Sequence, residues 1–349
     1  MFFLFYLCFQ FMSTQILTHK QPITLECGVT LPEVDIAYTT FGEMNADKSN
    51  VVWICHAFSA NSNPVEWWPG MVGEGLFLDP KKYFIVCANM LGSCYGTTGP
   101  LSLNTETGNK YYKDFPTVTV RDMVKTLTIL RKHLSIEKIF FACGFSMGGQ
   151  QLLEFVIQEP DIFDNILLGA TNIQHSPWGI AFNESQRLAI EADGTFGEAN
   201  DNAGINGMKA ARSIGLISYR NYKAYNKTQA EPDNDKLENF RACSYQRYQG
   251  EKLASRFNAY SYYILSKAMD NHNITRGRSN AKEVLSTVKC NVLVLGITSD
   301  FLYPLEEQQL LASLIPHSMF VEINSDYGHD GFLIENEQMS KILSAFLKV

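Results

Sequence analysis

The sequence has no Cys-x-x-Cys pair and no short cluster of cysteine and histidine with the spacing of metal ligands. Its eight cysteines are scattered over 349 residues, and most lie in apolar runs such as 51–58 and 83–90. Unpaired cysteine in such a run behaves as a small buried hydrophobic residue. These features exclude a zinc site and a disulfide framework, and they favour reduced thiols in the cytosol.

The chain also has no excess of positive charge, since 29 lysine and arginine residues oppose 36 aspartate and glutamate residues, for a net charge of −7. Without a basic surface, a nucleic-acid partner is not expected. The contents of 46% hydrophobic and 19% charged residues are typical of a soluble globular protein. The length predicts about two domains, or one α/β domain that carries an insertion.

The apolar run at residues 1–11 has no basic residue and no small-residue cleavage site, and it is too short to span a bilayer. Met12 begins a more ordinary cytosolic start. We therefore interpret residues 1–17 as an N-terminal extension produced by a start codon assigned too far upstream. A membrane anchor and a signal peptide are the alternatives. We expect a cytoplasmic protein with no membrane partner.

Short β-branched runs alternate with segments of helical periodicity, and several of these runs are apolar throughout. Continuous apolar strands are typical of a parallel sheet that helices cover on both faces. The pattern predicts a doubly wound α/β core. Strands are expected at 21–27, 35–41, 50–56, 83–89, 137–145, 165–171, 291–297 and 319–324, and helices at 119–134, 147–158, 305–314 and 335–347.

The alternation stops between residues 174 and 289, where the sequence is polar and aromatic and shows no clear strand. Helices are expected there at 184–192, 206–223, 236–249 and 258–270. A helical insertion before the last two strands indicates a cap over the carboxyl edge of the sheet, where ligands bind in such folds. The core then comprises residues 18–173 and 290–349.

Residues 144–148 read Gly-Phe-Ser-Met-Gly between a predicted strand and a predicted helix. This is the nucleophile elbow of α/β-hydrolases, in the structural context that the motif requires. The glycines are needed because the turn is strained and the strand and helix approach closely. Ser146 is therefore the predicted nucleophile, presented at a helix N-terminus that favours negative charge.

A serine hydroxyl needs a base, and the base needs an orienting carboxylate. In α/β-hydrolases the chain order is Ser, Asp, His. Asp300 follows the predicted strand 291–297, and His329 follows the last predicted strand. These two residues are expected to complete the triad. Asp326 is the nearest rival carboxylate, but it lies only three residues before the histidine.

The oxyanion hole needs two backbone donors, one from the residue after the nucleophile and one from a loop after an early strand. Met147 is the first of these. The loop after strand 50–56 offers Ala57 or Phe58 as the second, and we choose Phe58. His56, at the end of that strand, is interpreted as structural.

Longer stretches in a fixed order extend these motifs over the chain from about residue 20 to its end. They are ICHAFSAN (54–61), NMLGSCYGTTGP (89–100), FPTVTVRDMV (115–124), GFSMGGQQLLEF (144–155), WGIAFNESQRLAI (178–190), residues 245–278, GITSDFLYPLEEQ (296–308) and YGHDGFL (327–333). In these stretches the chain resembles the homoserine O-acetyltransferases, acyltransferases with the α/β-hydrolase fold.

The resemblance implies a ping-pong enzyme in which acetyl-CoA acylates the triad serine and L-homoserine takes the acetyl group, in methionine biosynthesis. It assigns Arg212 and Tyr219, on a cap helix, and Asp330 to substrate binding. An arginine fork suits the carboxylate of an amino acid, and an acid suits its ammonium. Arg187 faces either the cleft or solvent. No metal and no tightly bound cofactor is expected.

The resemblance also suggests a homodimer. The aromatic run 258–270 is either its self-association surface or a face that packs on the core. Three questions about function stay open from the residues. First, relatives with the same triad accept serine or use succinyl donors. Second, a carboxylester or thioester hydrolase would use the same triad with water as the acceptor. Third, a catalytically dead binding protein would keep the same pocket.

Overall fold

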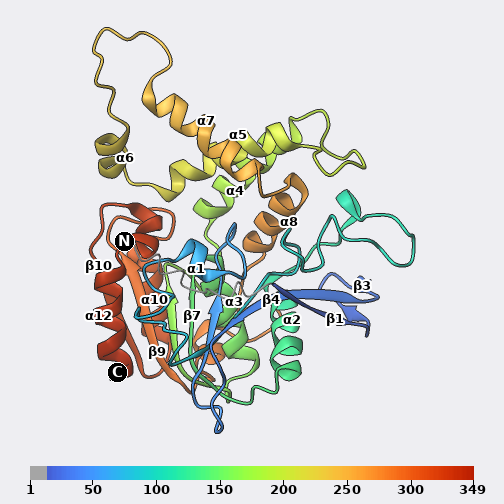
Figure 1. Cartoon of the computed structure of the whole chain (residues 1–349), viewed down its shortest axis with the longest axis vertical. Helices are drawn as coiled ribbons and strands as arrows, with labels where there is room; N and C mark the ends of the chain where they lie inside the picture. Colours follow the sequence, from blue (N-terminus) through green and yellow to red (C-terminus); the bar gives the residue numbers. More distant parts are fainter. Residues whose placement is uncertain (1–13) are drawn as a thin grey trace, which may run out of the picture.

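The computed structural model describes residues 14–349, and its centre is one eight-stranded sheet (Figure 1). The strand order is β1-β4-β6-β5-β7-β8-β9-β10, in which β4 pairs antiparallel with β1 and β6 and all other neighbours are parallel. The strands are Gln15–His19 (β1), Val34–Phe41 (β4), Val51–Cys55 (β5), Phe84–Ala88 (β6), Ile139–Phe145 (β7), Phe163–Gly169 (β8), Asn291–Ile297 (β9) and Ser318–Ile323 (β10).

Helices cover both faces of this sheet, as the apolar strands predict. Alternate residues of β5 belong to two buried clusters, with Trp53 in the cluster of α2 and α3 and Ile54 in the cluster of α12. The core helices are Pro64–Trp67 (α1), Val120–His133 (α2), Met147–Gln158 (α3), Leu305–Leu314 (α10), Gly331–Ile334 (α11) and Asn336–Leu347 (α12). Among residues 14–349, no helix has the length and apolar content needed to cross a membrane.

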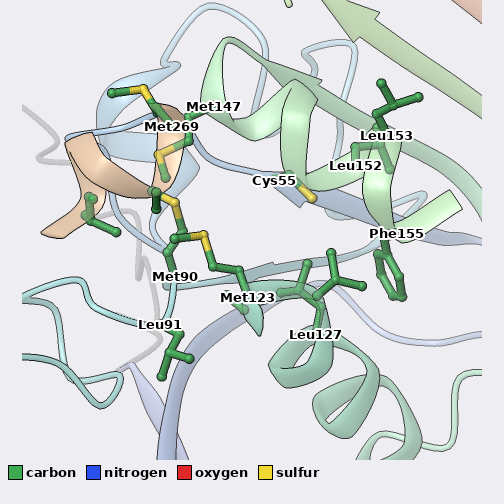
Figure 2. Packing of buried hydrophobic residues seen from close by; sticks show 14 of the residues in the cluster. Cys55, Met90, Leu91, Met123, Leu127, Met147, Leu152, Leu153, Phe155 and Met269 are labelled. Atoms are coloured by element: carbon green, nitrogen blue, oxygen red, sulfur yellow. The ribbon is translucent and has the colours of Figure 1, made fainter. Parts of the chain in front are cut away.

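Six helices lie between β8 and β9, in the segment expected to be the cap. They are Pro177–Glu191 (α4), Ile205–Tyr219 (α5), Tyr222–Gln229 (α6), Arg241–Ala254 (α7), Ala259–Asp270 (α8) and Ala281–Leu285 (α9). Figure 1 shows α5 and α7 side by side beyond one end of the sheet. Figure 2 shows Met269 of α8 near Met147 of α3, and both belong to one buried cluster, so this insertion shares its packing with the core.

The structure differs from the predictions at the N-terminal end. The strand expected at 21–27 is reduced to Ile23–Thr24 (β2), which pairs with Thr30–Leu31 (β3) through a turn that includes Gly28 at φ 86°. Strand β1 was not predicted, because most of its side chains are exposed and its backbone pairs with β4. It includes residues 15–17 of the expected N-terminal extension, whereas residues 1–13 lie outside the described residues.

The helices of the insertion are also displaced from the predicted ones. Helix α4 begins at Pro177, where the Ser176 hydroxyl accepts from the backbone N–H of Gly179. The single helix expected at 206–223 is broken, because the backbone at Arg220 is extended (φ −108°, ψ 157°). Helix α7 begins at Arg241, five residues after the predicted start at 236.

The turn from β7 into α3 brings backbone against backbone without room for a side chain. A Cβ atom on Gly148 would lie 2.1 Å from the carbonyl oxygen of Cys55, at the end of β5. A Cβ atom on Gly144 would lie 2.3 Å from the carbonyl oxygen of Gly148. Because neither oxygen is on a flexible side chain, glycine is needed for α3 to sit this close to the sheet.

We predict that Gly148→Ala lowers the free energy of unfolding by about 3 kcal/mol or more, because α3 must move away from β5 to make room for the methyl group. Gly194→Ala is the matched control, since its Cβ would meet no atom of residues 14–349 within 4 Å. Urea denaturation measures both. Equal stability of the two variants would show that the close approach is not required.

Candidate active site

The predicted site residues gather around one cavity of about 310 Å³ at the carboxyl edge of the sheet. Ser146, His329 and Phe58 line it from the core, and Arg212 and Tyr219 line it from α5. Asp330 also lines it. Parallel strands place their following loops on the same edge, so residues distant in the sequence converge here.

Ser146 adopts a strained backbone conformation, with φ 56° and ψ −128°. Its N–H donates to the carbonyl oxygen of Gly169 (3.0 Å). Its own carbonyl oxygen accepts from the Gln150 N–H (3.1 Å) and from the Thr171 hydroxyl (3.0 Å). Strain of this kind persists only where the surroundings fix the backbone, and it is concentrated at functional sites.

Asp300 and His329 form a buried pair. The Nδ1 atom of His329 lies 2.6 Å from Oδ2 of Asp300. The other carboxylate oxygen accepts from the backbone N–H groups of Leu302 (2.9 Å) and Tyr303 (3.0 Å). These two bonds fix the carboxylate, so that Oδ2 faces the imidazole. With its proton on Nδ1, the ring presents Nε2 as an acceptor on its opposite side.

Opposing effects act on the pKa of His329. Burial lowers it, whereas the charge of Asp300, the hydrogen bond to Asp300 and the charge of Asp330 raise it, and the net result is a pKa above the ordinary 6.5. The carboxylate therefore outweighs desolvation. An imidazole of this kind is a stronger base than a free one and is stabilised when it becomes protonated.

Within residues 14–349 no hydrogen bond joins the Ser146 hydroxyl to His329, although both side chains line the cavity. Hydrogen bonds between catalytic groups are often long in a free enzyme. Two backbone donors are available nearby. In the described part of the chain, neither the N–H of Phe58 nor that of Met147 donates to another group, and Met147 is the first residue of α3.

Arg212 is a cation without a partner at the cavity wall. In the described structure its guanidinium makes no hydrogen bond or ion pair, and its buried Nε atom is unsatisfied. It lies over the ring of Tyr219, at 5.3 Å from the ring centroid. An unpaired guanidinium in a partly buried cavity is suited to a carboxylate, which it binds through two parallel hydrogen bonds.

Asp330 has a partner that the sequence did not predict. Its Oδ2 atom lies 3.2 Å from the Arg220 guanidinium, which also lines the cavity. Arg220 lies eight residues after Arg212 in the same short stretch, and this second arginine was the signal that sequence reasoning missed. Its placement depends on the break between α5 and α6, which periodicity did not show.

Three other candidates lie outside the cavity lining. Arg187, left open between cleft and solvent, is buried and pairs with Asp270 at 2.6 Å. Asp326 is 69% exposed and lies 3.7 Å from Lys223. His56 is fully buried, and burial lowers its pKa to about 4. Among residues 14–349, no group of three or more histidine, cysteine or acidic residues is arranged to hold a metal ion.

Comparisons with known proteins agree with this architecture. The family profile described as "alpha/beta hydrolase fold" matches residues 50–335, which confirms the predicted fold. The chain is 48% identical over 335 residues to the homoserine O-acetyltransferase of Cyclobacterium marinum, and the match covers 96% of this chain and 95% of that protein.

Solved structures also share the fold of this chain. Homoserine O-acetyltransferase from Bacillus anthracis superposes with a TM-score of 0.89 at 25% identity, covering 97% of this chain and 98% of that one. An acetylester hydrolase from Corynebacterium glutamicum shares the fold, with a TM-score of 0.84 at 21% identity over 97% and 96% of the two chains. The resemblance inferred from the sequence motifs is confirmed, and this chain belongs to the homoserine O-acetyltransferase family of the α/β-hydrolase fold.

Proposed function

We propose that this protein transfers the acetyl group of acetyl-CoA to the side-chain hydroxyl of L-homoserine, through an acyl-enzyme on Ser146. The curated relatives that match nearly the whole chain are named for this acceptor and this acyl group. The observation that carries the proposal is the unpaired Arg212 guanidinium in the same cavity as Ser146. An esterase that uses water as acceptor has no need for such a carboxylate-binding group.

In the first half-reaction, Nε2 of His329 accepts the proton of the Ser146 hydroxyl while Oγ attacks the acetyl carbonyl carbon. The N–H groups of Phe58 and Met147 hold the oxyanion, in a buried site where such donors are most effective. The protonated His329 is stabilised by Asp300. As the tetrahedral intermediate collapses, the bond from the acetyl carbon to sulfur breaks, and His329 gives its proton to the sulfur, so that coenzyme A leaves as its thiol.

In the second half-reaction, L-homoserine occupies the cavity with its carboxylate on Arg212. Its ammonium binds the carboxylate of Asp330, whose Oδ2 atom lies 3.2 Å from the Arg220 guanidinium. The ring of Tyr219 stabilises the Arg212 guanidinium through a cation–π interaction. His329 takes the proton of the homoserine hydroxyl as that oxygen attacks the acetyl carbonyl carbon. The bond from this carbon to Ser146 Oγ then breaks, and His329 returns the proton to Oγ.

Transfer prevails over hydrolysis only when the bound acceptor is better oriented than water. We assign this role to residues 174–289 as a cap over the core of residues 18–173 and 290–349. Phe58 stacks edge-on against Tyr262 of α8 at 4.7 Å between centroids, so the cap packs directly on the loop that supplies an oxyanion donor. A place in methionine biosynthesis, a cytoplasmic location and a homodimer remain predictions.

We predict that the purified protein releases thiol from acetyl-CoA at a rate that rises steeply and saturably with L-homoserine. L-serine as acceptor and succinyl-CoA as donor are the comparison substrates. Release that is the same with and without any amino acid would contradict the proposal and identify water as the acceptor. A preference for L-serine would revise the acceptor alone.

We predict that Arg212→Ala raises the KM for L-homoserine by about 10- to 100-fold, because the substrate carboxylate loses a charged hydrogen-bonding partner. The KM for acetyl-CoA should change little. Arg247→Ala is the control, since Arg247 is an exposed cap arginine that does not line the cavity. An unchanged KM for L-homoserine in Arg212→Ala would show that another group holds the carboxylate.

A further inference from the structure

Arg220 and Asp330 connect the insertion to the loop that carries His329. Nη1 of Arg220 lies 3.2 Å from Oδ2 of Asp330, and both side chains line the cavity. The other terminal nitrogen, Nη2, donates to the Tyr245 hydroxyl of α7 (3.3 Å). Only 26% of the Arg220 side chain and 19% of the Asp330 side chain are exposed. Solvent screens a partly buried ion pair less than a surface pair, so this contact can fix the position of the carboxylate.

Close backbone packing brings the two residues of this pair together. Gly328 has φ 67°, and a Cβ atom there would lie 2.9 Å from the carbonyl carbon of Arg220 and 2.9 Å from the Asn221 nitrogen. A side chain would therefore keep the loop from lying directly on the break between α5 and α6. The Gly328 N–H donates to the Ser299 hydroxyl (2.8 Å), and the Asn221 side chain donates to the Ser299 carbonyl oxygen (3.4 Å). Asp330, two residues after the glycine, is thereby held beside Arg220.

The Asp330 carboxylate depends on Arg220 for its orientation. Among residues 14–349, no hydrogen bond and no other ion pair reaches this carboxylate. It is also the one acid among the described residues that line the cavity, where Arg212, Lys252 and Arg256 are further cations. A carboxylate that nothing fixes is attracted to such neighbours. If it paired with Arg212, the two charged groups of the proposed homoserine site would bind each other instead of the substrate.

We propose that Arg220 is a positioning residue, which directs the Asp330 carboxylate at the ammonium of L-homoserine and keeps it from pairing with Arg212. The inference rests on the proposed function, since it requires Asp330 to bind this ammonium. The positive charge of Arg220 offsets part of the attraction between the carboxylate and the ammonium. The fixed orientation outweighs this loss, because a free carboxylate would pair with another cation of the cavity.

We expect Arg220→Ala to raise the KM for L-homoserine by about 10-fold and to change kcat little, because the ammonium loses a fixed partner while the triad keeps its contacts. Steady-state kinetics of coenzyme A release measure both constants. Arg220→Lys should recover part of the loss, since it restores the positive charge but not the two-sided contact with Asp330 and Tyr245. The melting temperature checks that each variant is folded.

Lys223→Ala is the matched control. Lys223 lies 3.7 Å from Asp326, so this ion pair joins the same loop to α6, but both side chains are mostly exposed and lie outside the cavity lining. Its removal should leave the KM for L-homoserine at the wild-type value. An equal rise in KM in the two variants would overturn the inference, because any contact between the loop and this part of the insertion would then have the same effect.

A double-mutant cycle with Asp330→Asn separates positioning from packing. Asp330→Asn alone should raise the KM for L-homoserine by about 10-fold or more, because the ammonium loses its charged partner. Adding Arg220→Ala should then raise the KM further by less than about twofold, because the arginine has no carboxylate left to direct. Independent effects of the two substitutions would overturn the inference. So would an unchanged or lower KM in Arg220→Ala.

Failure of the proposed function gives a different result. If the wild-type protein releases thiol from acetyl-CoA equally with and without L-homoserine, the proposed acceptor is wrong, and the inference about Arg220 fails with it. If Asp330→Asn alone leaves the KM at the wild-type value, Asp330 is not the ammonium ligand, and the inference fails with that assignment. If the wild-type protein transfers acetyl to L-homoserine and needs Asp330, a silent Arg220→Ala refutes the role of Arg220 alone.

Discussion

Contact between the first turn of α3 and the end of β5 is the constraint on which the site depends. Gly148 brings the helix so close that even a methyl group would overlap the Cys55 carbonyl oxygen. The short turn that results holds Ser146 in a conformation that L-residues rarely adopt. Among the described residues, the same turn leaves the N–H of Met147 at a helix N-terminus without an acceptor. The proposed nucleophile and the proposed oxyanion donor therefore have one structural cause.

The remaining chemistry follows from competition between burial and charge at this edge of the sheet. Burial lowers the pKa of His175 to about 3 and keeps that ring neutral, whereas Asp300 raises the pKa of His329 despite burial. Two buried histidines in one cavity therefore have different protonation properties. Asp300, which the backbone N–H groups of Leu302 and Tyr303 hold in place, contributes most to this difference, and the charge of Asp330 adds to it.

Regular elements with strong local signals were predicted closely from the sequence. Strand 291–297 and helices 147–158 and 305–314 have the predicted bounds, because burial on both strand faces and clear periodicity mark them. The convergence of Ser146 with the loops that carry Asp300 and His329 follows from parallel strand order.

The insertion and the lining of the cavity were less predictable. Helices there pack on one another and on the core, so polar positions such as Arg187 are buried through ion pairs that no local pattern shows. The pairing of Arg220 with Asp330 joins residues 110 positions apart, across a helix break.

The central claim is that the acetyl group resides on Ser146 between donor and acceptor. The most direct measurement is the intact mass of the protein after mixing with acetyl-CoA alone, followed by peptide mapping and then by addition of L-homoserine. We predict a gain of one acetyl group on the peptide that contains Ser146 and its loss when L-homoserine is added. Transfer without any acetylated protein, or an acetyl group on another residue, would contradict the account.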